Sequence, residues 1–242
     1  MSIKKKFVAI IPAKKKSFRI PNKNLLKING KSLVVKSIQD AKKSKYIKEI
    51  FVSTDSKKIF NIAKSYGLKN LGLRSKKFSG KLSTMHSVIK HEIKKISFDF
   101  DYLIILQPTS PYRSFKDIDN ACKKMVKNKS ADSLVSCSSL PENYHPKKLM
   151  LKENSFLKFF DLRSIFLNNL KINKNLKIFK TKSIGKINKK SLLLFRNGAI
   201  YITKREKISN YIIGGKIISY EMPFEKSLDI NDYDDLKELR KF

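Results

Sequence analysis

The chain alternates short apolar runs with stretches in which apolar residues recur at helical spacing. Strand-like apolar runs occupy residues 7–11, 49–53, 102–106 and 132–137. Helical patterns are expected at residues 32–43, 56–66 and 86–96, with Ser83 as a candidate N-cap of the third. Because strands separated by helices are joined by crossover connections, this alternation predicts a doubly wound α/β fold with a mostly parallel sheet.

The alternation of strand and helix patterns is interrupted in the second half of the chain. Between residues 140 and 191, Leu and Phe side chains are interleaved with Lys and Asn, without a clear strand or helix period. A long irregular segment inside a compact domain needs a reason, so we interpret it as an insertion with local structure of its own within a single domain of residues 1–242. Strands at 199–202 and 216–221 and a closing helix at 233–241 are expected after it.

The chain is strongly basic, with 54 Lys and Arg against 20 Asp and Glu and a formal charge of +34. Such a charge by itself suggests nucleic acid or an anionic membrane surface as a partner. However, only 7 of these bases are Arg, the side chain best suited to base edges and phosphates, and the Lys residues are scattered. A basic nucleic-acid-binding protein therefore remains an alternative that rests on composition alone, and the charge also suits small anionic substrates.

The cysteines and the apolar runs bear on the compartment. Cys122 and Cys137 are too few for a disulfide framework and lack metal-ligand spacing, which indicates a reducing compartment. The first apolar run stops at Pro12 and is followed by more Lys, unlike a signal peptide, and no run approaches the length of a membrane span. We expect a cytoplasmic protein without a membrane partner.

The three His residues are too dispersed for a zinc site or a catalytic triad.

Polar and basic residues follow the expected strands. Residues 107–113, Gln-Pro-Thr-Ser-Pro-Tyr-Arg, come directly after the third apolar run, at the edge where open α/β sheets bind ligands. The alternative is a Pro-rich turn with Ser and Thr as turn formers. Residues 14–24 follow the first run and offer Lys, Arg, Ser and Asn donors for phosphate, although a surface Lys run is often only solvated.

Two candidate features lie near the carboxyl end. Asn197-Gly198 precedes an expected strand and is consistent with a simple turn. Asp229 and Asn231 lie two residues apart, so on an extended segment their side chains project to the same face. Oxygen ligands on one face suit Mg²⁺. The alternative is that Asn231 caps the last helix.

Six segments, in order, resemble the acylneuraminate cytidylyltransferases, which make CMP-activated sialic acids and their relatives. They are Ile-Pro-Ala at 11–13, Ile-Pro-Asn-Lys-Asn at 20–24, Ser-Thr-Asp at 53–55, Leu-Gln-Pro-Thr-Ser-Pro-Tyr-Arg at 106–113, Asn-Gly-Ala-Ile-Tyr-Ile at 197–202 and Ser-Leu-Asp-Ile-Asn at 227–231. The resemblance implies a nucleotide-diphospho-sugar transferase-like fold. It also implies Mg²⁺-dependent transfer of CMP from CTP to a nonulosonic acid, and a homodimer formed through an arm at 140–191.

The resemblance also implies roles for individual residues. Lys23 and Asp229 are expected to be catalytic, with Mg²⁺ held by Asp229 and Asn231. Nucleotide contacts are expected from Lys14, Ser17, Arg19, Asn24, Arg74, Ser83 and Thr84. Sugar contacts are expected from Gln107, Thr109, Ser110, Arg113, Lys148 and Asn197.

The chain departs from the family pattern in its basic loop and in two other places. Lys14 replaces an Arg, Lys16 a Gly and Phe18 a Lys. The loss of Gly matters if that position needs a positive φ or a close approach of the backbone to phosphate. Lys81 stands where an Asp is frequent, and Asn-Lys-Lys at 188–190 replaces an Arg-Gln pair. These departures leave open a same-fold enzyme for another sugar acid or nucleotide, or a non-catalytic relative.

Overall fold

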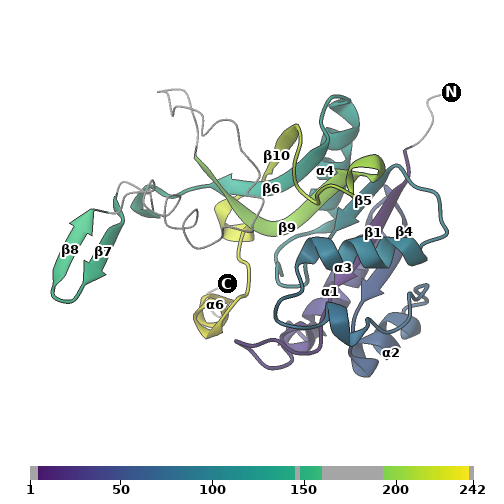
Figure 1. Ribbon diagram of the computed structural model, residues 1–242, viewed down its shortest axis with the longest axis horizontal. Coiled ribbons are helices and arrows are strands. Elements are labelled where there is room, and N and C mark those ends of the chain that lie inside the picture. Colours follow the sequence, from purple (N-terminus) through teal and green to yellow (C-terminus); the bar gives the residue numbers. More distant parts are fainter. Residues whose placement is uncertain (1–4, 145–147, 160–192, 240–242) are drawn as a thin grey trace. The chain divides into compact units, whose positions relative to one another are not determined.

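The computed structural model of the chain describes residues 5–144, 148–159 and 193–239 (Figure 1). The chain divides into two compact units. The first comprises Met1–Ser138 and Arg196–Phe242, and the second Ser139–Phe195. The second unit covers nearly the same residues as the expected insertion at 140–191, whose function as a dimerisation arm remains a prediction.

The first unit is built on a six-stranded sheet with the strand order β10-β6-β9-β5-β1-β4. Its strands are β1 (Phe7–Pro12), β4 (Ile47–Ser53), β5 (Tyr102–Ile105), β6 (Ser133–Ser139), β9 (Leu194–Lys204) and β10 (Ile217–Glu221). β1 pairs in parallel with both β4 and β5, and β6 pairs in parallel with β10, whereas β9 runs antiparallel to β5. The predicted mostly parallel α/β sheet is therefore confirmed.

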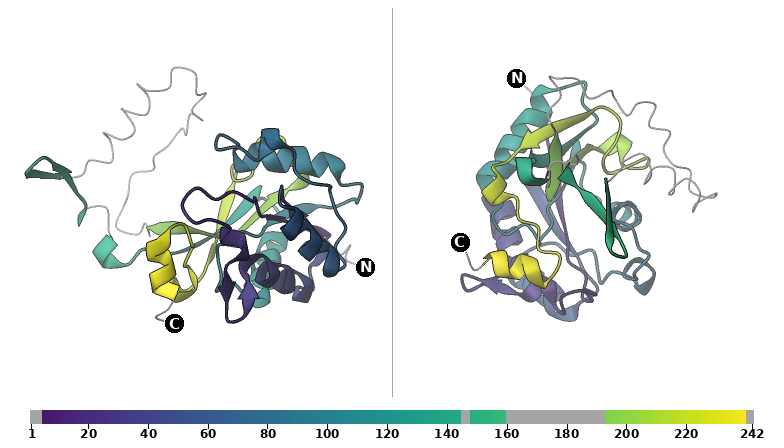
Figure 2. Two further views of the ribbon diagram at one scale, coloured as in Figure 1. Left: turned by 90° about the horizontal axis from the view of Figure 1, so that it is seen from below. Right: turned by 90° about the vertical axis from the view of Figure 1, so that its left-hand side faces the viewer.

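Helices cover both faces of this sheet (Figure 2). They are α1 (Leu33–Lys43), α2 (Lys57–Ser65), α3 (Met85–Glu92), α4 (Phe115–Lys127) and α6 (Tyr233–Glu238). Successive side chains of β1 point to opposite faces: Ile11 packs in one core cluster with Ile38 of α1, and Ile10 in another with Ile89 of α3. The α1, α2 and α4 helices share the first cluster, so the layers are helix, sheet and helix.

Single turns of 3₁₀ helix connect several elements. They lie at Lys23–Leu25, Lys76–Phe78, Ile93–Lys95, Glu142–Tyr144, Arg205–Lys207 and Phe224–Lys226. The turn at Ile93–Lys95 continues α3 and accounts for the end of the helix expected at 86–96. No helix among the described residues is both long and apolar enough to cross a membrane.

The helix caps correct two expectations. The N-cap of α3 is Thr84, whose side chain accepts a hydrogen bond from the Ser87 N–H at 3.1 Å, so the assignment to Ser83 is wrong. The N-cap of α6 is Asp232, which forms a reciprocal capping box with Asp235. Asn231 is therefore not the cap, because the following Asp offers the better-placed carboxylate.

One helix and two hairpins were not expected from the sequence. Helix α4 starts at a capping box in which Ser114 and Asp117 satisfy each other's backbone N–H groups. A small hairpin of β2 (Lys27–Ile28) and β3 (Lys31–Ser32) turns at Asn29 and Gly30, both with positive φ. In the second unit, β7 (Met150–Glu153) and β8 (Phe156–Phe159) form another hairpin, so this stretch does contain strands.

Candidate active site

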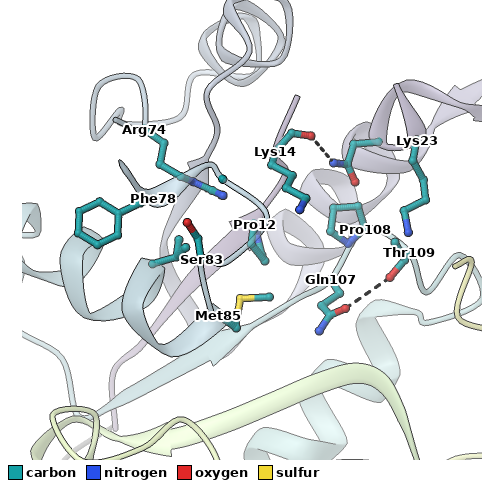
Figure 3. A pocket seen from close by; sticks show the side chains of 13 residues that line it. Pro12, Lys14, Lys23, Arg74, Phe78, Ser83, Met85, Gln107, Pro108 and Thr109 are labelled. Atoms are coloured by element: carbon teal, nitrogen blue, oxygen red, sulfur yellow. Dashed lines mark hydrogen bonds between the residues drawn. The ribbon is translucent and has the colours of Figure 1, made fainter. Parts of the chain in front are cut away.

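A pocket lies where the loops after β1 and β5 meet the segment that precedes α3, at the carboxyl edge of the parallel strands (Figure 3). This edge is where open α/β sheets generally bind ligands. The pocket is lined by Pro12, Lys14, Lys23, Asn24, Arg74, Phe78, Gly80, Ser83, Met85, Val88, Gln107, Pro108 and Thr109. It therefore brings together seven of the residues that the sequence singled out: Lys14, Lys23, Asn24, Arg74, Ser83, Gln107 and Thr109.

Two hydrogen bonds hold the basic loop after β1 in place. The buried Asn24 side chain donates to the Lys14 carbonyl oxygen at 3.0 Å, closing the loop on itself. The Lys15 N–H donates to the Asp55 carboxylate at 2.6 Å, which ties the loop to the Ser-Thr-Asp segment after β4. Among the described non-glycine residues, positive φ is confined to Asn22, Asn29 and Asn154. Lys16 therefore has no positive φ, so the replacement of Gly does not strain the backbone of this loop.

Lys23 places an ammonium group between the pocket and the carboxyl-terminal segment. Its Nζ donates to the Ile230 carbonyl oxygen at 2.8 Å. Burial lowers the pKa of Lys23, and the neighbouring Asp229 carboxylate opposes this effect. A partly desolvated cation with one fixed partner is suited to a second, anionic partner in the pocket.

Arg74 is a buried guanidinium that also reaches the pocket. Its Nε donates to the Ser53 hydroxyl at 2.9 Å, and a second guanidinium nitrogen donates to the Ser53 carbonyl oxygen. Burial lowers the pKa of Arg74, and the charge of the buried Glu92 opposes this effect. In Figure 3, Arg74 approaches from one side of the pocket and Lys14 and Lys23 from the other. The pocket is thus flanked by positive charge.

The Gln107 amide and the Thr109 hydroxyl lie in the same pocket (Figure 3). The Thr109 hydroxyl lies 3.5 Å from the Gln107 amide oxygen, so any hydrogen bond between them is weak. The Thr109 carbonyl oxygen accepts from the Ile230 N–H at 2.8 Å. This backbone bond holds the loop after β5 against the segment that carries Asp229.

The two oxygens of the Asp229 carboxylate differ in their hydrogen bonding. Its Oδ2 accepts from the Asn231 amide at 3.1 Å, whereas its Oδ1 is buried with no hydrogen-bond partner among the described residues. Gly198 has a φ of +78°, and a Cβ at this position would lie 3.2 Å from Asp229 Oδ2. The unpartnered carboxylate oxygen fits a hard cation, which takes oxygen ligands. The part of the chain that the structure describes contains no cluster of three or more His, Cys, Asp or Glu suited to a metal.

Several expected sugar-binding residues lie elsewhere. The Arg113 side chain is fully buried, and its guanidinium donates to Gln107 and Ala199 carbonyl oxygens at 2.8 and 3.0 Å and to the Ser37 hydroxyl at 2.8 Å. Burial lowers the pKa of Arg113 to about 10. Ser110 is also buried. The Arg113 guanidinium therefore stabilises the loop after β5 through these hydrogen bonds, and it does not line the pocket.

Asn197 likewise holds the structure around the site. Its amide oxygen accepts from the Ser136 hydroxyl at 2.6 Å, and its amide nitrogen donates to the Ser227 hydroxyl at 2.9 Å. Because Ser227 lies two residues before Asp229, these bonds fix the start of the segment that carries the carboxylate. Direct contact between Asn197 and a sugar remains a prediction.

The remaining expected residues are not among those that line the pocket. Ser17 is half-buried and Arg19 is exposed, and the Thr84 side chain caps α3. Lys148 belongs to the second unit, where it is exposed and pairs with Glu142 at 3.4 Å. Residues 188–190 lie outside the described residues. Substrate contacts by these side chains remain predictions.

The sequence did not identify the apolar side of the pocket, formed by Phe78, Met85 and Val88. Met85 and Val88 lie three apart at the start of α3, a spacing that places them on one helix face. This periodicity was the available signal. The Ser53 contacts that orient Arg74 were also missed, because the two residues lie 21 positions apart.

Known proteins resemble this chain in sequence and in fold. The sequence pattern of the family described as Cytidylyltransferase matches residues 8–239. The N-acylneuraminate cytidylyltransferase of Escherichia coli is 30% identical over 232 residues, which cover 94% of this chain and 49% of that protein. The CMP-N,N'-diacetyllegionaminic acid synthase of Legionella pneumophila is 37% identical over 138 residues, covering 56% of this chain and 59% of that protein. The chain thus spans about half the length of these relatives.

Among solved structures, a CMP:2-keto-3-deoxy-manno-octonic acid synthetase complexed with CTP superposes with a TM-score of 0.66. The match covers 98% of this chain and 97% of that one at 17% identity, and it supports the fold. The family pattern extends over nearly all of the sequence and includes every segment that forms the pocket. The chain therefore belongs to the cytidylyltransferase family, as the six sequence motifs predicted.

Proposed function

We propose that this chain transfers CMP from CTP to the anomeric hydroxyl of a nonulosonic acid, a sialic-type sugar acid, releasing pyrophosphate. The observation that carries the proposal is the pocket itself. Lys14, Lys23 and Arg74 surround it with positive charge, while Gln107 and Thr109 offer neutral hydrogen-bonding groups. A triphosphate and a polyhydroxylated acid need this combination. Relatives whose names specify acylneuraminate and legionaminic acid support the choice of acceptor.

In the proposed reaction, the anomeric oxygen attacks the α-phosphorus of CTP. The bond from that phosphorus to the bridging oxygen breaks, and pyrophosphate leaves with the bonding electrons while the hydroxyl proton passes to solvent. Negative charge grows on the leaving group, so Lys14 and Lys23 lower the barrier by stabilising it. Asn24, bonded to the Lys14 carbonyl oxygen, keeps that loop in the geometry that binds the triphosphate.

A Mg²⁺ ion is part of the proposal, with Asp229 and Asn231 as its protein ligands. The buried Asp229 Oδ1 without a partner among the described residues supports this assignment. When bound there, Mg²⁺ would neutralise phosphate charge and polarise the phosphoryl group. The Lys23 ammonium, next to Asp229, would hold the same phosphates from the side of the basic loop.

Dimerisation through the second unit and a cytoplasmic location complete the proposal. In the β7–β8 hairpin, Phe156 and Leu157 are 74% and 63% exposed, and apolar side chains this exposed favour a partner surface. Cys122 and Cys137 are free and buried, which fits a reducing compartment. The second copy of the chain is the partner we propose.

The direct test is pyrophosphate release from CTP and Mg²⁺ with a panel of nonulosonic acids. We expect release with one acid, and none from Asp229→Ala. Asp99→Ala serves as the matched control, because this carboxylate pairs with Arg205 and does not line the pocket. Silence across the panel from a protein that CTP still stabilises thermally would favour another sugar acid or a non-catalytic relative. Salt-sensitive nucleic-acid binding without any CTP effect would favour the basic-protein alternative.

A further inference from the structure

The exposed ring of Phe18 collects three lysine side chains. Phe18 lies on the outer part of the loop after β1 and is 56% exposed. The ammonium nitrogens of Lys14, Lys16 and Lys81 lie 5.2, 5.7 and 6.0 Å from its ring centroid. Lys14 and Lys16 share a loop with Phe18, whereas Lys81 comes from the segment before α3. The ring therefore links the two loops on either side of the pocket.

The positive charge of this cluster is not balanced. Within the described ranges, no ion pair is formed by Lys14, Lys16 or Lys81. The face of an aromatic ring attracts an ammonium group but carries no net charge. Three like charges gathered on one ring repel each other, so a multivalent anion is the ligand that would stabilise the arrangement.

The cluster adjoins the pocket. Lys14 lines the pocket, as do Gly80 and Ser83 on either side of Lys81. The Ser83 hydroxyl donates to the Lys77 carbonyl oxygen at 3.0 Å, which holds the short segment that presents Lys81. A phosphate chain bound between Lys14 and Lys23 would have Lys81 within reach at its outer end.

We propose, on the basis of the proposed function, that Lys81 binds the β- and γ-phosphates of the nucleotide and the pyrophosphate product. Phe18 is then a positioning residue, because its ring holds Lys81 and Lys16 on the same side as Lys14. The alternative is that Lys81 binds the carboxylate of the sugar acid, or is merely solvated. The three cases differ in which ligand responds to the loss of its charge.

The first experiment compares binding of inorganic triphosphate, CTP and pyrophosphate by wild type and Lys81→Ala. We expect all three to bind roughly five- to tenfold more weakly to the variant, as for the loss of one exposed charge-assisted contact. Lys123→Ala is the control, because it removes the same charge from an exposed position on α4 outside the pocket. Unchanged triphosphate binding by Lys81→Ala, or a rise only in the KM for the sugar acid, would overturn the proposal.

The second experiment tests Phe18 through a double-mutant cycle. Phe18→Leu keeps an apolar side chain but removes the ring, so we expect part of the Lys81→Ala loss. The double variant should bind triphosphate no more than about twofold more weakly than Lys81→Ala, whereas independent residues would give additive losses. Additive losses would therefore remove the positioning role. If wild type binds triphosphate but shows no turnover, the proposed function alone is contradicted. If Lys81→Ala shows normal turnover and binds triphosphate as tightly as wild type, this inference alone is contradicted.

Discussion

The ammonium nitrogen of Lys23 lies 2.8 Å from the carbonyl oxygen of Ile230, a contact between residues 207 positions apart. The N–H of the same Ile230 donates to the Thr109 carbonyl oxygen at 2.8 Å. One peptide segment therefore holds together the loop after β1, the loop after β5 and the neighbouring Asp229. The geometry of the pocket depends on this junction as well as on the side chains that line it.

Replacing Lys23 with Arg should change the pH dependence of CTP binding. Burial lowers the pKa of Lys23 below the ordinary value of 10.5. The side chain therefore loses its charge at a lower pH than an ordinary lysine, and CTP affinity should fall as the pH rises through this value. Because Arg keeps its charge, Lys23→Arg should move this loss to higher pH, measured as CTP-induced thermal stabilisation from about pH 7 to 10.5.

The pH dependence of protein stability distinguishes a loss of CTP affinity from unfolding at high pH. Since the folded-state pKa of Lys23 is the lower one, the folded protein binds fewer protons than the unfolded chain between the two pKa values. The contribution of Lys23 to stability therefore increases with pH in that window. An identical CTP profile for wild type and Lys23→Arg would show that Lys23 is not the titrating contact.

The Ser53 hydroxyl should control CTP binding through Arg74. Ser53→Ala removes the acceptor of the Arg74 Nε bond and leaves a buried donor unpaired. We expect the KM for CTP to rise roughly three- to tenfold with kcat nearly unchanged. Ser133→Ala removes a comparable side-chain bond, to the Gly214 carbonyl oxygen, outside the pocket and should lower stability without changing the KM. Equal kinetics for the two variants would contradict the positioning role.

A methyl group at Gly198 should disturb the Asp229 carboxylate. The added Cβ would lie 3.2 Å from Asp229 Oδ2, and the φ of +78° strains any L side chain. Gly67 has a similar φ of +70° with nothing within 4 Å of an added Cβ. Both Ala variants should lose about 1–2 kcal/mol of stability, but only Gly198→Ala should lose most of its activity. Equal activity of the two folded variants would argue against a catalytic Asp229.

Arg113→Lys separates a structural from a substrate-binding role. Lysine cannot reproduce the three separate hydrogen bonds of the buried guanidinium. We expect a loss of about 2–4 kcal/mol in the free energy of unfolding, measured by denaturant titration. The fraction that remains folded should keep its KM for the sugar acid. A large rise in that KM without loss of stability would instead restore Arg113 as a sugar contact.

The sequence predicted the strands of the six-stranded sheet and most of the helices because their signals are local. Apolar runs such as residues 7–11 and 102–106 became the central strands β1 and β5 almost unchanged. Helix α4 was missed although its Ser114–Asp117 capping box is visible in the sequence. The antiparallel pairing of β9 with β5 joins residues about 100 positions apart, and no local pattern encodes it.

The site was predicted in part for the same reason. Lys14, Lys23, Gln107 and Thr109 sit in loops directly after strands, so the general geometry of α/β sheets predicts that they converge. Arg113 lies in one of the same loops, but its side chain turns inward to bond backbone carbonyl oxygens. Sequence spacing does not reveal which way a loop side chain points, because tertiary packing decides its direction.

Asn231→Asp should strengthen metal binding at a cost in stability. The Asn231 amide donates to Asp229 Oδ2 at 3.1 Å, so it partly compensates the charge of the carboxylate. A second carboxylate would replace this donor with a like charge, lowering the free energy of unfolding without metal by about 1 kcal/mol. With Mg²⁺ present, the added charge should lower the half-saturating concentration roughly three- to tenfold.

Thermal denaturation at increasing Mg²⁺ concentration checks both parts of the Asn231→Asp prediction, because the variant should start at a lower Tm and gain more from the ion. Asn61→Asp is a suitable control, since this exposed residue of α2 changes the net charge equally outside the pocket. If the two variants respond alike to Mg²⁺, the residues around Asp229 are not the metal site, and the unpartnered Oδ1 must instead receive a proton donor from the substrate.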